Sequence, residues 1–503
     1  MEAQNSRLLL GYDLGSSSIK ASVIEAQSGK LVASATWPNE EMPISSPRAG
    51  WAEQHPDLWW ENLKNVTRQL LQTVEGRHID AIGIAYQMHG LVAVDKNLQV
   101  LRPSIIWCDS RAVEIGKTAF AELGQSYCLS HYLNSPGNFT ASKLRWVKEN
   151  EPELYEKIYK VMLPGDFIAM KMTGQPQTTV SGLSEGIMWD FKEEQLAGKL
   201  LRHYGIDPEL LPEVVDTFSV QGELSRQAAE ELGLQPGTPV AYRAGDQPNN
   251  AFSLNVLQPG EVAATAGTSG VVYGITERPD YDPKSRVNTF VHVNHGHAGT
   301  SRYGVLLCVN GTGILNSWFK NNMTGISKMS YEQMNALVAQ APAGSEGIVV
   351  LPFGNGAERI LENREIQSQI HGLNFTRHNQ AHMFRAMQEG IVFALHYGFG
   401  IMQQMGTAVD TVKAGHANMF LSQVFRETFA SVTGAVVELY NTDGSQGAAR
   451  GAGVGTGVYK AFNEAFAGLQ TILRVEPKQQ ERQQYQDAYQ RWLEVLQKYV
   501  PSA

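Results

Sequence analysis

Residues 8–25, LLLGYDLGSSSIKASVIE, decide the fold class of this 503-residue chain. The apolar run at 8–12 is typical of a buried strand, and residues 18–25 alternate apolar and polar side chains as a second strand does. Residues 31–37 supply a third extended run. Between the first two strands, residues 13–18 are rich in Gly and Ser, whose backbone N–H groups can face an anion. We therefore predict a three-stranded meander whose first turn binds phosphate.

The next elements continue this sheet as an α/β unit. Apolar side chains at positions 63, 66, 70 and 74 have helical spacing behind Pro56-Asp57, a plausible helix start. Residues 79–85 then predict a strand. A strand, helix and strand in this order imply a parallel pair, with ligand groups just past the carboxyl end of the strand. The segment Gln-Met-His-Gly at 87–90 occupies that place.

The opening pattern occurs a second time, at residues 262–273. An apolar strand again turns through Gly and hydroxyl residues, and Gly267 lies about half the chain length after Gly15. Two strands (411–414 and 436–440), a helical stripe at 420–429 and a small-residue helix at 447–452 follow it as a second α/β unit. The tail from Glu481 has one apolar face and predicts a terminal helix docked on a lobe. The chain is thus expected to be a duplicated fold with two lobes facing a cleft.

Composition narrows the classes of protein. With 43% hydrophobic and 18% charged residues, the chain resembles a soluble globular protein. A formal net charge of −9 disfavours a nucleic-acid partner. No run approaches the roughly 20 apolar residues of a membrane span, so no membrane partner is expected. The three cysteines, Cys108, Cys128 and Cys308, suit neither a disulfide framework nor a four-thiolate zinc site and favour a cytoplasmic location.

Three other motifs are weighed and set aside. Gly116-Lys117-Thr118 ends like a P-loop, but Arg111 stands where its first Gly belongs. Residues 182–186 match the G-x-S-x-G hydrolase motif, yet no clear helix follows it. Histidines 292, 295 and 297 lie close in sequence, but without a carboxylate or cysteine beside them they are better explained as strand residues than as metal ligands.

Three aspartates lie where chemistry is expected, namely Asp13, Asp109 and Asp246. A single Asp beside Gly is ordinarily a turn cap. Three of them at strand ends near phosphate-type turns favour phosphoryl transfer, which needs Mg²⁺ on the phosphate oxygens and a base for the acceptor hydroxyl.

An ordered set of motifs resembles the FGGY carbohydrate kinases, and among them the members that act on xylulose. The set runs over residues 8–453 and consists of YDLGSS at 12–17, QMHG at 87–90, WCDSR at 107–111, Gly245-Asp246, and GTSG at 267–270. The resemblance implies an α/β fold of two actin-like (ribonuclease-H-like) lobes with the active site between them. It implies that residues 1–252 form the lobe with the sugar site and the first phosphate turn. Residues 253–503 are implied as the nucleotide lobe. Packing of the last helix back on the first lobe is an open alternative.

The implied reaction is ATP-dependent phosphorylation of a sugar hydroxyl, D-xylulose to D-xylulose 5-phosphate, with ATP and Mg²⁺. The resemblance makes Asp246 the general base and Asp13 the residue that positions the metal. The implied sugar-binding residues are Gln87, Met88, His89, Trp107, Asp109, Arg111, Asp246 and Gln247. The implied nucleotide-binding residues are Gly15, Ser16, Ser17, Gly267, Thr268, Ser269, Trp318, Gly415, Ala417 and Asn418.

Two departures from the family pattern keep alternatives open. Gln247 stands where the family commonly has Asn, so a longer amide lies beside the implied base and a different sugar is an alternative. His416 and Met419 alter the nucleotide turn, so different adenine contacts are an alternative. The alternatives are a kinase for another ketose or polyol, an actin-like ATPase switch, and a catalytically weak sugar-binding regulator. A homodimer is also open.

Overall fold

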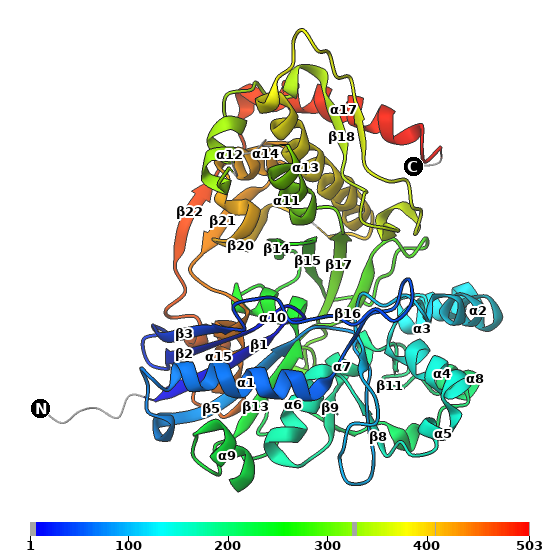
Figure 1. Cartoon of the computed structure of the whole chain (residues 1–503), viewed down its shortest axis with the longest axis vertical. Coiled ribbons are helices and arrows are strands. Elements are labelled where there is room, and N and C mark those ends of the chain that lie inside the picture. The colour runs from blue at the N-terminus through cyan, green and yellow to red at the C-terminus, as the bar shows by residue number, and fades with distance from the viewer. Residues whose placement is uncertain (1–6, 324–328, 408, 502–503) are drawn as a thin grey trace, which may run out of the picture. The chain divides into compact units, whose positions relative to one another are not determined.

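The computed structural model describes residues 7–323, 329–407 and 409–501, which form two compact units (Figure 1). The first unit comprises the residues up to Asn255 together with Phe290–Tyr303 and Thr442–Leu469. The second comprises Val256–Thr289, Gly304–Asn441 and the residues from Gln470 on. Both units are therefore discontinuous in sequence. The predicted functional division of the chain at 252/253 stays a prediction, because it concerns which ligand each lobe binds.

A five-stranded sheet of order β13-β5-β1-β2-β3 is the centre of the first unit. Its strands are β1 (Leu8–Leu14), β2 (Ile19–Glu25), β3 (Leu31–Trp37), β5 (Ile79–Tyr86) and β13 (Val240–Gly245). The first three strands pair antiparallel, whereas β5 pairs parallel with β1 and β13 pairs parallel with β5. The predicted meander and the predicted parallel pair are both confirmed.

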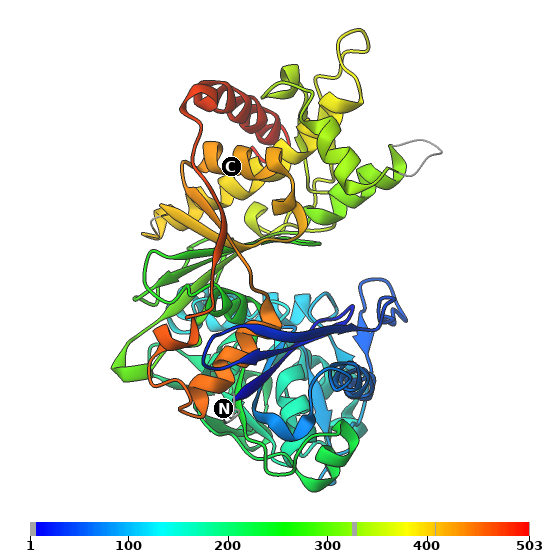
Figure 2. The same cartoon turned by 90° about the vertical axis from the view of Figure 1, so that its left-hand side faces the viewer.

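Helices α1 (Pro56–Leu70) and α15 (Gly444–Gly455) cover opposite faces of this sheet (Figure 2). Since side chains alternate along a strand, Leu10 and Tyr12 join the apolar core with α1, whereas Gly11 faces α15. The predicted helix was one turn too long, because α1 ends at Leu70. Val74 lies beyond the end of this helix and is nevertheless buried.

Helix α15 contacts the sheet backbone to backbone. A Cβ atom on Gly11 would collide with the backbone of residues 445 and 449, and one on Gly83 in β5 would collide with the carbonyl of residue 448. The small-residue sequence of α15, GSQGAARGAGVG, permits this approach. The helix begins at Gly444, three residues before its predicted start, with the Asp443 side chain accepting from the Gln446 N–H as N-cap.

The second unit repeats the strand order of the first. Its sheet runs β16-β17-β15-β14-β20-β21-β22. The strands are β14 (Val262–Ala266), β15 (Gly270–Thr276), β16 (Asn288–Val291), β17 (Tyr303–Val309), β20 (Thr411–Gly415), β21 (Val436–Tyr440) and β22 (Thr471–Val475). β14 pairs antiparallel with β15 and parallel with β20, which pairs parallel with β21. The run β17-β15-β14-β20-β21 thus corresponds to β3-β2-β1-β5-β13 of the first unit, as expected for a duplicated α/β fold, and the second sheet adds β16 beside β17 and β22 beside β21.

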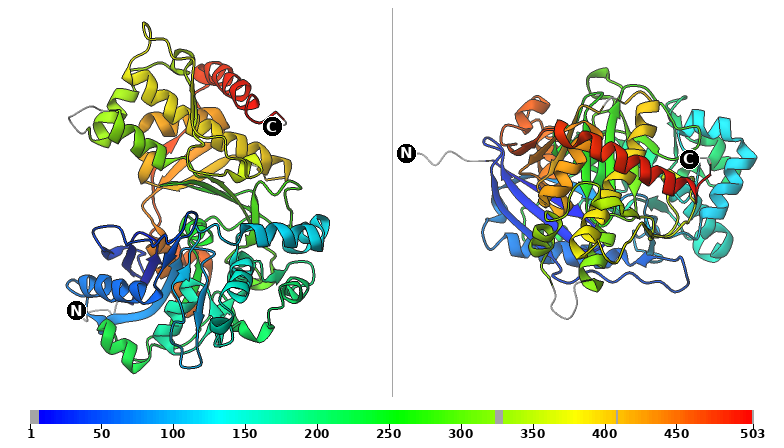
Figure 3. Two further views of the ribbon diagram at one scale, coloured as in Figure 1. Left: turned by 45° about the vertical axis from the view of Figure 1, so that its right-hand side comes forward. Right: turned by 90° about the horizontal axis from the view of Figure 1, so that it is seen from above.

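The helices of the second unit enclose its own apolar core (Figure 3). They include α13 (Gln380–Gln404), α14 (Gln423–Thr433) and α17 (Arg482–Gln497). In α17, the buried Trp492 donates its indole N–H to the carbonyl oxygen of Val350 at 3.0 Å. The terminal helix therefore packs in the second unit, and the late segment that packs in the first unit is 442–469.

Within the described ranges, no helix is both long enough and apolar enough to cross a bilayer.

Candidate active site

The carboxyl edge of the first sheet brings three predicted segments together. Strands β1, β5 and β13 are parallel neighbours, so their carboxyl ends lie at one edge. Asp13 is the penultimate residue of β1, and Asp246 opens α10 (Asp246–Ser253) directly after β13. Between them, Gln87 follows β5 and donates its backbone N–H to the carbonyl oxygen of Leu14 at 2.8 Å. Residues far apart in sequence thus meet at this edge.

Gly245 lets the segment after β5 pack against the start of α10. A Cβ atom on Gly245 would lie 2.7 Å from the Cγ of Met88 and 3.3 Å from a carboxylate oxygen of Glu185. The first of these distances is shorter than side chains tolerate, so only glycine fits here. Met88 and Glu185 are therefore immediate neighbours of the residue that precedes Asp246.

Burial and neighbouring carboxylates raise the pKa of both Asp13 and Asp246. Both side chains are half-buried. Loss of hydration raises the pKa of Asp246 to about 7, and repulsion from Asp13 adds to this rise. Loss of hydration likewise raises the pKa of Asp13 to about 6, with repulsion from Asp443 adding and Lys20 opposing. Two carboxyl groups with such values accept a proton near neutral pH, and together they favour a nearby cation.

The N-terminus of α15 closes the site beside Asp13. A Cβ atom on Gly444 would collide with the Asp13 carboxylate, so helix and carboxylate are in direct contact. Lys20 stands opposite Asp13 in β2 and pairs with Asp443 at 2.7 Å. One ammonium group is therefore shared by the two acidic residues at this end of the sheet.

A magnesium ion would have to be held largely by its own water and by substrate. Among the described residues, no group of three or more His, Cys, Asp or Glu side chains is arranged as a metal site. Mg²⁺ in phosphoryl-transfer enzymes is commonly bound by one or two carboxylates plus water and phosphate oxygens. Asp13 and Asp246, with their raised pKa values, fit that pattern.

His89 is held in an unusual backbone conformation, with φ at 63°. Its backbone N–H donates to a carboxylate oxygen of Glu185 at 3.3 Å, and its ring Nδ1 lies 2.9 Å from the backbone carbonyl oxygen of Glu185. The rings of Phe139 and Phe290 lie against the imidazole, with centroids 4.9 and 5.4 Å away. Within the predicted Met88-His89 pair, the imidazole thus packs against two aromatic rings.

Sequence reasoning missed Glu185, Phe139 and Phe290 as neighbours of His89. Glu185 lies in the G-x-S-x-G stretch, which drew attention to Ser184 alone. The Ser184 hydroxyl donates to the carbonyl oxygen of Ser181 at 2.7 Å and accepts from the Val291 N–H at 3.0 Å. Since this hydroxyl is fully buried and bonded on both sides, the stretch serves the fold and not a hydrolase nucleophile.

Trp107, Asp109 and Arg111 take different positions. Trp107 is 44% exposed, and its indole N–H lies 3.4 Å from the Ser16 hydroxyl in the first turn. Asp109 is fully buried and binds the Arg111 guanidinium, which also pairs with Glu53 at 2.8 Å. The structure therefore places Trp107 at the first turn. Asp109 and Arg111 are directed into the protein, where they bind each other and Glu53.

The first turn is compact and supported by a buried side chain. The Gly15 N–H donates to the Ser18 carbonyl oxygen at 3.0 Å, which closes the turn. The carbonyl oxygen of Ser16 accepts from the Gln54 side chain at 2.7 Å, and Ser17 is exposed. Gln87 is buried, and its amide nitrogen lies 3.4 Å from the amide oxygen of Gln54. Gln87 therefore contacts the side chain that binds the first turn.

The second unit brings most of the predicted nucleotide residues together. Helix α11 (Gly313–Asn322) starts at the second turn, because the N–H groups of Gly313 and Ile314 donate to the carbonyl oxygens of Gly267 and Thr268 at 2.9 and 3.1 Å. A Cβ atom on Gly267 would lie 3.6 Å from the Asn418 amide nitrogen. Trp318 is on α11 and is 52% exposed. Ser269 completes the second turn, and Gly415 and Ala417 belong to the same loop as Asn418.

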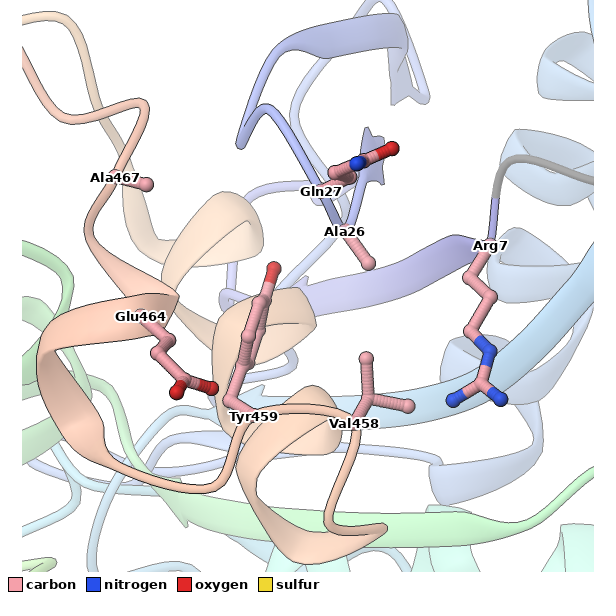
Figure 4. A pocket seen from close by; sticks show the side chains of 7 residues that line it. All are labelled: Arg7, Ala26, Gln27, Val458, Tyr459, Glu464 and Ala467. Atoms are coloured by element: carbon pink, nitrogen blue, oxygen red, sulfur yellow. The ribbon is translucent and has the colours of Figure 1, made fainter. Parts of the chain in front are cut away.

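A separate pocket of about 490 Å³ lies elsewhere in the first unit (Figure 4). It is lined by Arg7, Ala26, Gln27, Val458, Tyr459, Glu464 and Ala467. Among these described residues, none belongs to the predicted sugar or nucleotide sets, and the two charged side chains have opposite signs. The candidate active site is therefore the carboxyl edge of the sheet and not this pocket.

Family models of known proteins match both α/β units of this chain. Residues 8–253 match the N-terminal domain model of the FGGY family of carbohydrate kinases, and residues 262–456 match its C-terminal domain model. The chain therefore belongs to the FGGY family of carbohydrate kinases and is a sugar kinase by class.

Several relatives cover almost the whole chain. The xylulose kinase of Bacillus subtilis is 29% identical over 96% of this chain and 95% of the relative. The L-xylulose/3-keto-L-gulonate kinase of Escherichia coli is 31% identical over 97% of this chain and 96% of the relative. The crystal structure of xylulose kinase from Rhodospirillum rubrum superposes with a TM-score of 0.86 at 26% identity, covering 98% of this chain and 99% of that one. The two-unit α/β fold is thus that of known sugar kinases.

Proposed function

We propose that this sugar kinase transfers the γ-phosphoryl group of ATP to the terminal hydroxyl of D-xylulose, giving D-xylulose 5-phosphate. The observation that carries the proposal is the convergence of Asp13, Met88-His89 and Asp246 at one edge of the first sheet. At that edge, Asp13 supplies a carboxylate for a cation and Asp246 a carboxylate that can accept a proton. Met88 and His89 supply an apolar and a polar side chain for contact with a sugar.

Asp246 is the base in this proposal. It takes the proton of the sugar hydroxyl while the hydroxyl oxygen attacks the γ-phosphorus and ADP leaves. A base works best when its pKa lies near the working pH, and burial raises the pKa of Asp246 to about 7. Its place at the start of α10, beside Met88, puts the carboxylate next to the proposed sugar site.

The phosphate groups of ATP are assigned to the two glycine turns. In the first unit these are Gly15, Ser16 and Ser17, and in the second Gly267, Thr268 and Ser269. Asp13 would hold Mg²⁺ through water. When bound, Mg²⁺ neutralises charge on the phosphate oxygens. The loop of Gly415, Ala417 and Asn418, with Trp318 on α11, is assigned to adenosine.

The choice of sugar is supported by the names of relatives and is open to one specific alternative. Relatives from several bacteria are called xylulose kinase, whereas a relative of comparable identity is called L-xylulose/3-keto-L-gulonate kinase. Gln247, one methylene longer than the commonly found Asn, lies directly beside the proposed base. A kinase for another ketose is therefore the second candidate.

An ADP-release screen with Mg²⁺ and ATP over pentuloses, hexuloses and polyols tests the proposal. We expect D-xylulose to give the highest kcat/KM and the rate without sugar to be far lower. A higher kcat/KM for L-xylulose would select the second candidate. ATP consumption that does not depend on sugar would indicate an ATPase switch, and sugar binding without turnover would indicate a regulator.

Substitution of the base tests the mechanism. Asp246→Asn keeps the size of the side chain but cannot take a proton, so we expect kcat to fall by at least ~10²-fold while sugar binding persists. Asp57→Asn, an exposed residue in the first turn of α1, is the matched control and should leave kcat unchanged. Near-normal turnover by Asp246→Asn would remove Asp246 from the role of base.

A further inference from the structure

Lys143 belongs to none of the predicted motifs, yet its side chain binds two segments of the proposed sugar site. It belongs to α4 (Thr140–Asn150), and its side chain is fully buried. Its Nζ donates to the backbone carbonyl oxygens of His89 at 2.8 Å and of Ile106 at 2.9 Å. One amino group thus joins the loop after β5 to the segment that leads into Trp107.

Glu185 holds His89 from the other side. It ends α7 (Val180–Glu185) and is 2% exposed. Its carboxylate accepts from the backbone N–H of His89, and its backbone carbonyl oxygen lies 2.9 Å from the ring Nδ1. Because a carbonyl oxygen can only accept, Nδ1 must carry the proton of a neutral ring. Nε2 is then the nitrogen that can accept a hydrogen bond.

The two residues together bind both the backbone and the ring of His89. Its backbone N–H and its ring bind Glu185, and its carbonyl oxygen binds Lys143. A non-glycine residue at a φ of 63° is disfavoured and persists only where its surroundings determine it. Strained residues of this kind gather at ligand sites. The holding contacts come from two helices that are separate in sequence from the loop itself.

We propose that Lys143 and Glu185 are positioning residues that preset His89, with its proton on Nδ1, as a hydrogen-bond acceptor for a hydroxyl group of the sugar. This inference rests on the proposed function, because it takes His89 as a sugar contact. Neither residue touches the reacting atoms in it. Both act through the backbone and ring orientation of His89.

The state of the ring is measurable without any substrate. In ¹⁵N-histidine-labelled protein at pH 8, the ring signals of His89, assigned by their loss in His89→Gln, should show protonated Nδ1. Lys143→Met keeps the apolar stem but removes both donors, so we expect those signals to report mixed tautomers or exchange broadening. An unchanged single tautomer in Lys143→Met would overturn the inference, whether or not the enzyme phosphorylates xylulose.

Kinetics provide the second readout. Lys143→Met and Glu185→Ala should each raise the KM for the sugar by at least ~10-fold and leave the KM for ATP within about twofold, because a lost hydrogen bond in a sugar site weakens sugar binding alone. Glu185→Gln retains an acceptor oxygen and should recover most of the loss. Lys148→Met, at a half-buried position on the same helix whose amino group binds Gly205 and not His89, is the matched control and should match wild type.

A double substitution separates positioning from general destabilisation. If Lys143 acts through His89, adding Lys143→Met to His89→Ala should raise the sugar KM no further. Fully additive effects, or equal increases in both KM values, would refute the inference. Melting temperatures of all variants accompany these data, and if Glu185→Ala does not fold, Lys143→Met and Glu185→Gln decide the question.

Discussion

His89 is the residue on which sugar recognition is expected to depend most. Its imidazole contacts the rings of Phe139 and Phe290, which also contact each other, and its backbone is held by hydrogen bonds to two other elements. A ring fixed in this way can make one directional hydrogen bond to a hydroxyl group at little further entropic cost.

We therefore predict that His89→Ala raises the KM for the sugar more than the KM for ATP. Steady-state kinetics with each substrate varied in turn measure the two values. His78→Ala, an exposed histidine just before β5, serves as the control and should change neither. Equal effects on both substrates would argue against a sugar contact at His89.

Asp109 and Arg111 make buried contacts that their sequence motif did not predict. Asp109 and Arg111 belong to the motif that suggested sugar binding, yet both are buried and bind each other and Glu53. Arg111 also stacks on Trp51, with its guanidinium carbon 3.8 Å from the ring centroid. Their contacts with each other and with Glu53 support the segment 107–111, and a direct sugar contact by either residue stays a prediction.

At the scale of elements, the contact between α15 and the first sheet leaves no room for a side chain on the facing glycines of the strands. Gly83→Ala would drive a methyl group into the backbone carbonyl of residue 448. Since neither backbone can yield freely, we expect a loss of about 1–3 kcal/mol or more in the stability of the first unit. Thermal unfolding followed by calorimetry measures the change.

Gly400→Ala is the opposite case and the control for Gly83→Ala. Gly400 is inside α13, and a Cβ atom there would meet no described atom within 4 Å. The gain in helix propensity should stabilise the second unit by roughly 0.5–1 kcal/mol. If both substitutions destabilise their units alike, close approach is not the reason for the glycine at position 83.

The packing of α13 on α17 makes the second unit sensitive to acid. His396 in α13 lies 4.7 Å from the ring centroid of Tyr489 in α17, and burial lowers its pKa to about 4. The unfolded chain takes up this proton near the ordinary value of 6.5, so stability is lost as the pH falls from about 6.5 to about 4. At about 1.4 kcal/mol per pKa unit, the loss is roughly 3 kcal/mol at most.

His396→Gln should remove this part of the pH dependence. Urea unfolding of the second unit at pH 7.5 and pH 5 should show a smaller difference for His396→Gln than for the wild type. His371→Gln, a half-buried histidine in β19 (Gln369–His371), is the matched control. An unchanged difference for His396→Gln would assign the acid sensitivity to other groups.

At the scale of the molecule, the first unit is completed by two later parts of the chain. Residues 290–303 supply Phe290 against His89, and residues 442–469 supply α15 against the sheet. A fragment ending at Asn255 would leave the α15 face of the sheet in water. We predict that fragment 1–255 shows no cooperative unfolding transition and binds a hydrophobic dye.

Calorimetry and dye fluorescence of the fragment, alone and coexpressed with residues 256–503, test this prediction. Coexpression should restore a cooperative transition, because the missing segments are then supplied in trans. A fragment that unfolds cooperatively by itself would show that α15 is dispensable for the first sheet.

Local pattern was enough to predict most elements. The meander at 8–37, the strand at 79–86 and the repeat at 262–276 follow from apolar alternation, and Asp13 and Asp246 follow from their place at strand ends. The predicted helix ends were wrong in two places, since α1 stops before Val74 and α15 begins before residue 447. The periodicity of buried side chains does not mark the residue at which backbone hydrogen bonding ends.

Strand periodicity and turn chemistry are properties of neighbouring residues, so the duplicated α/β fold and the identity of the candidate carboxylates follow from local sequence. Three-dimensional packing places α15 on the first sheet and α17 in the second unit, and it brings Lys143, Glu185 and Phe290 into contact with His89. These contacts join segments about 50 to 440 residues apart, and the packing that selects them is invisible in local pattern.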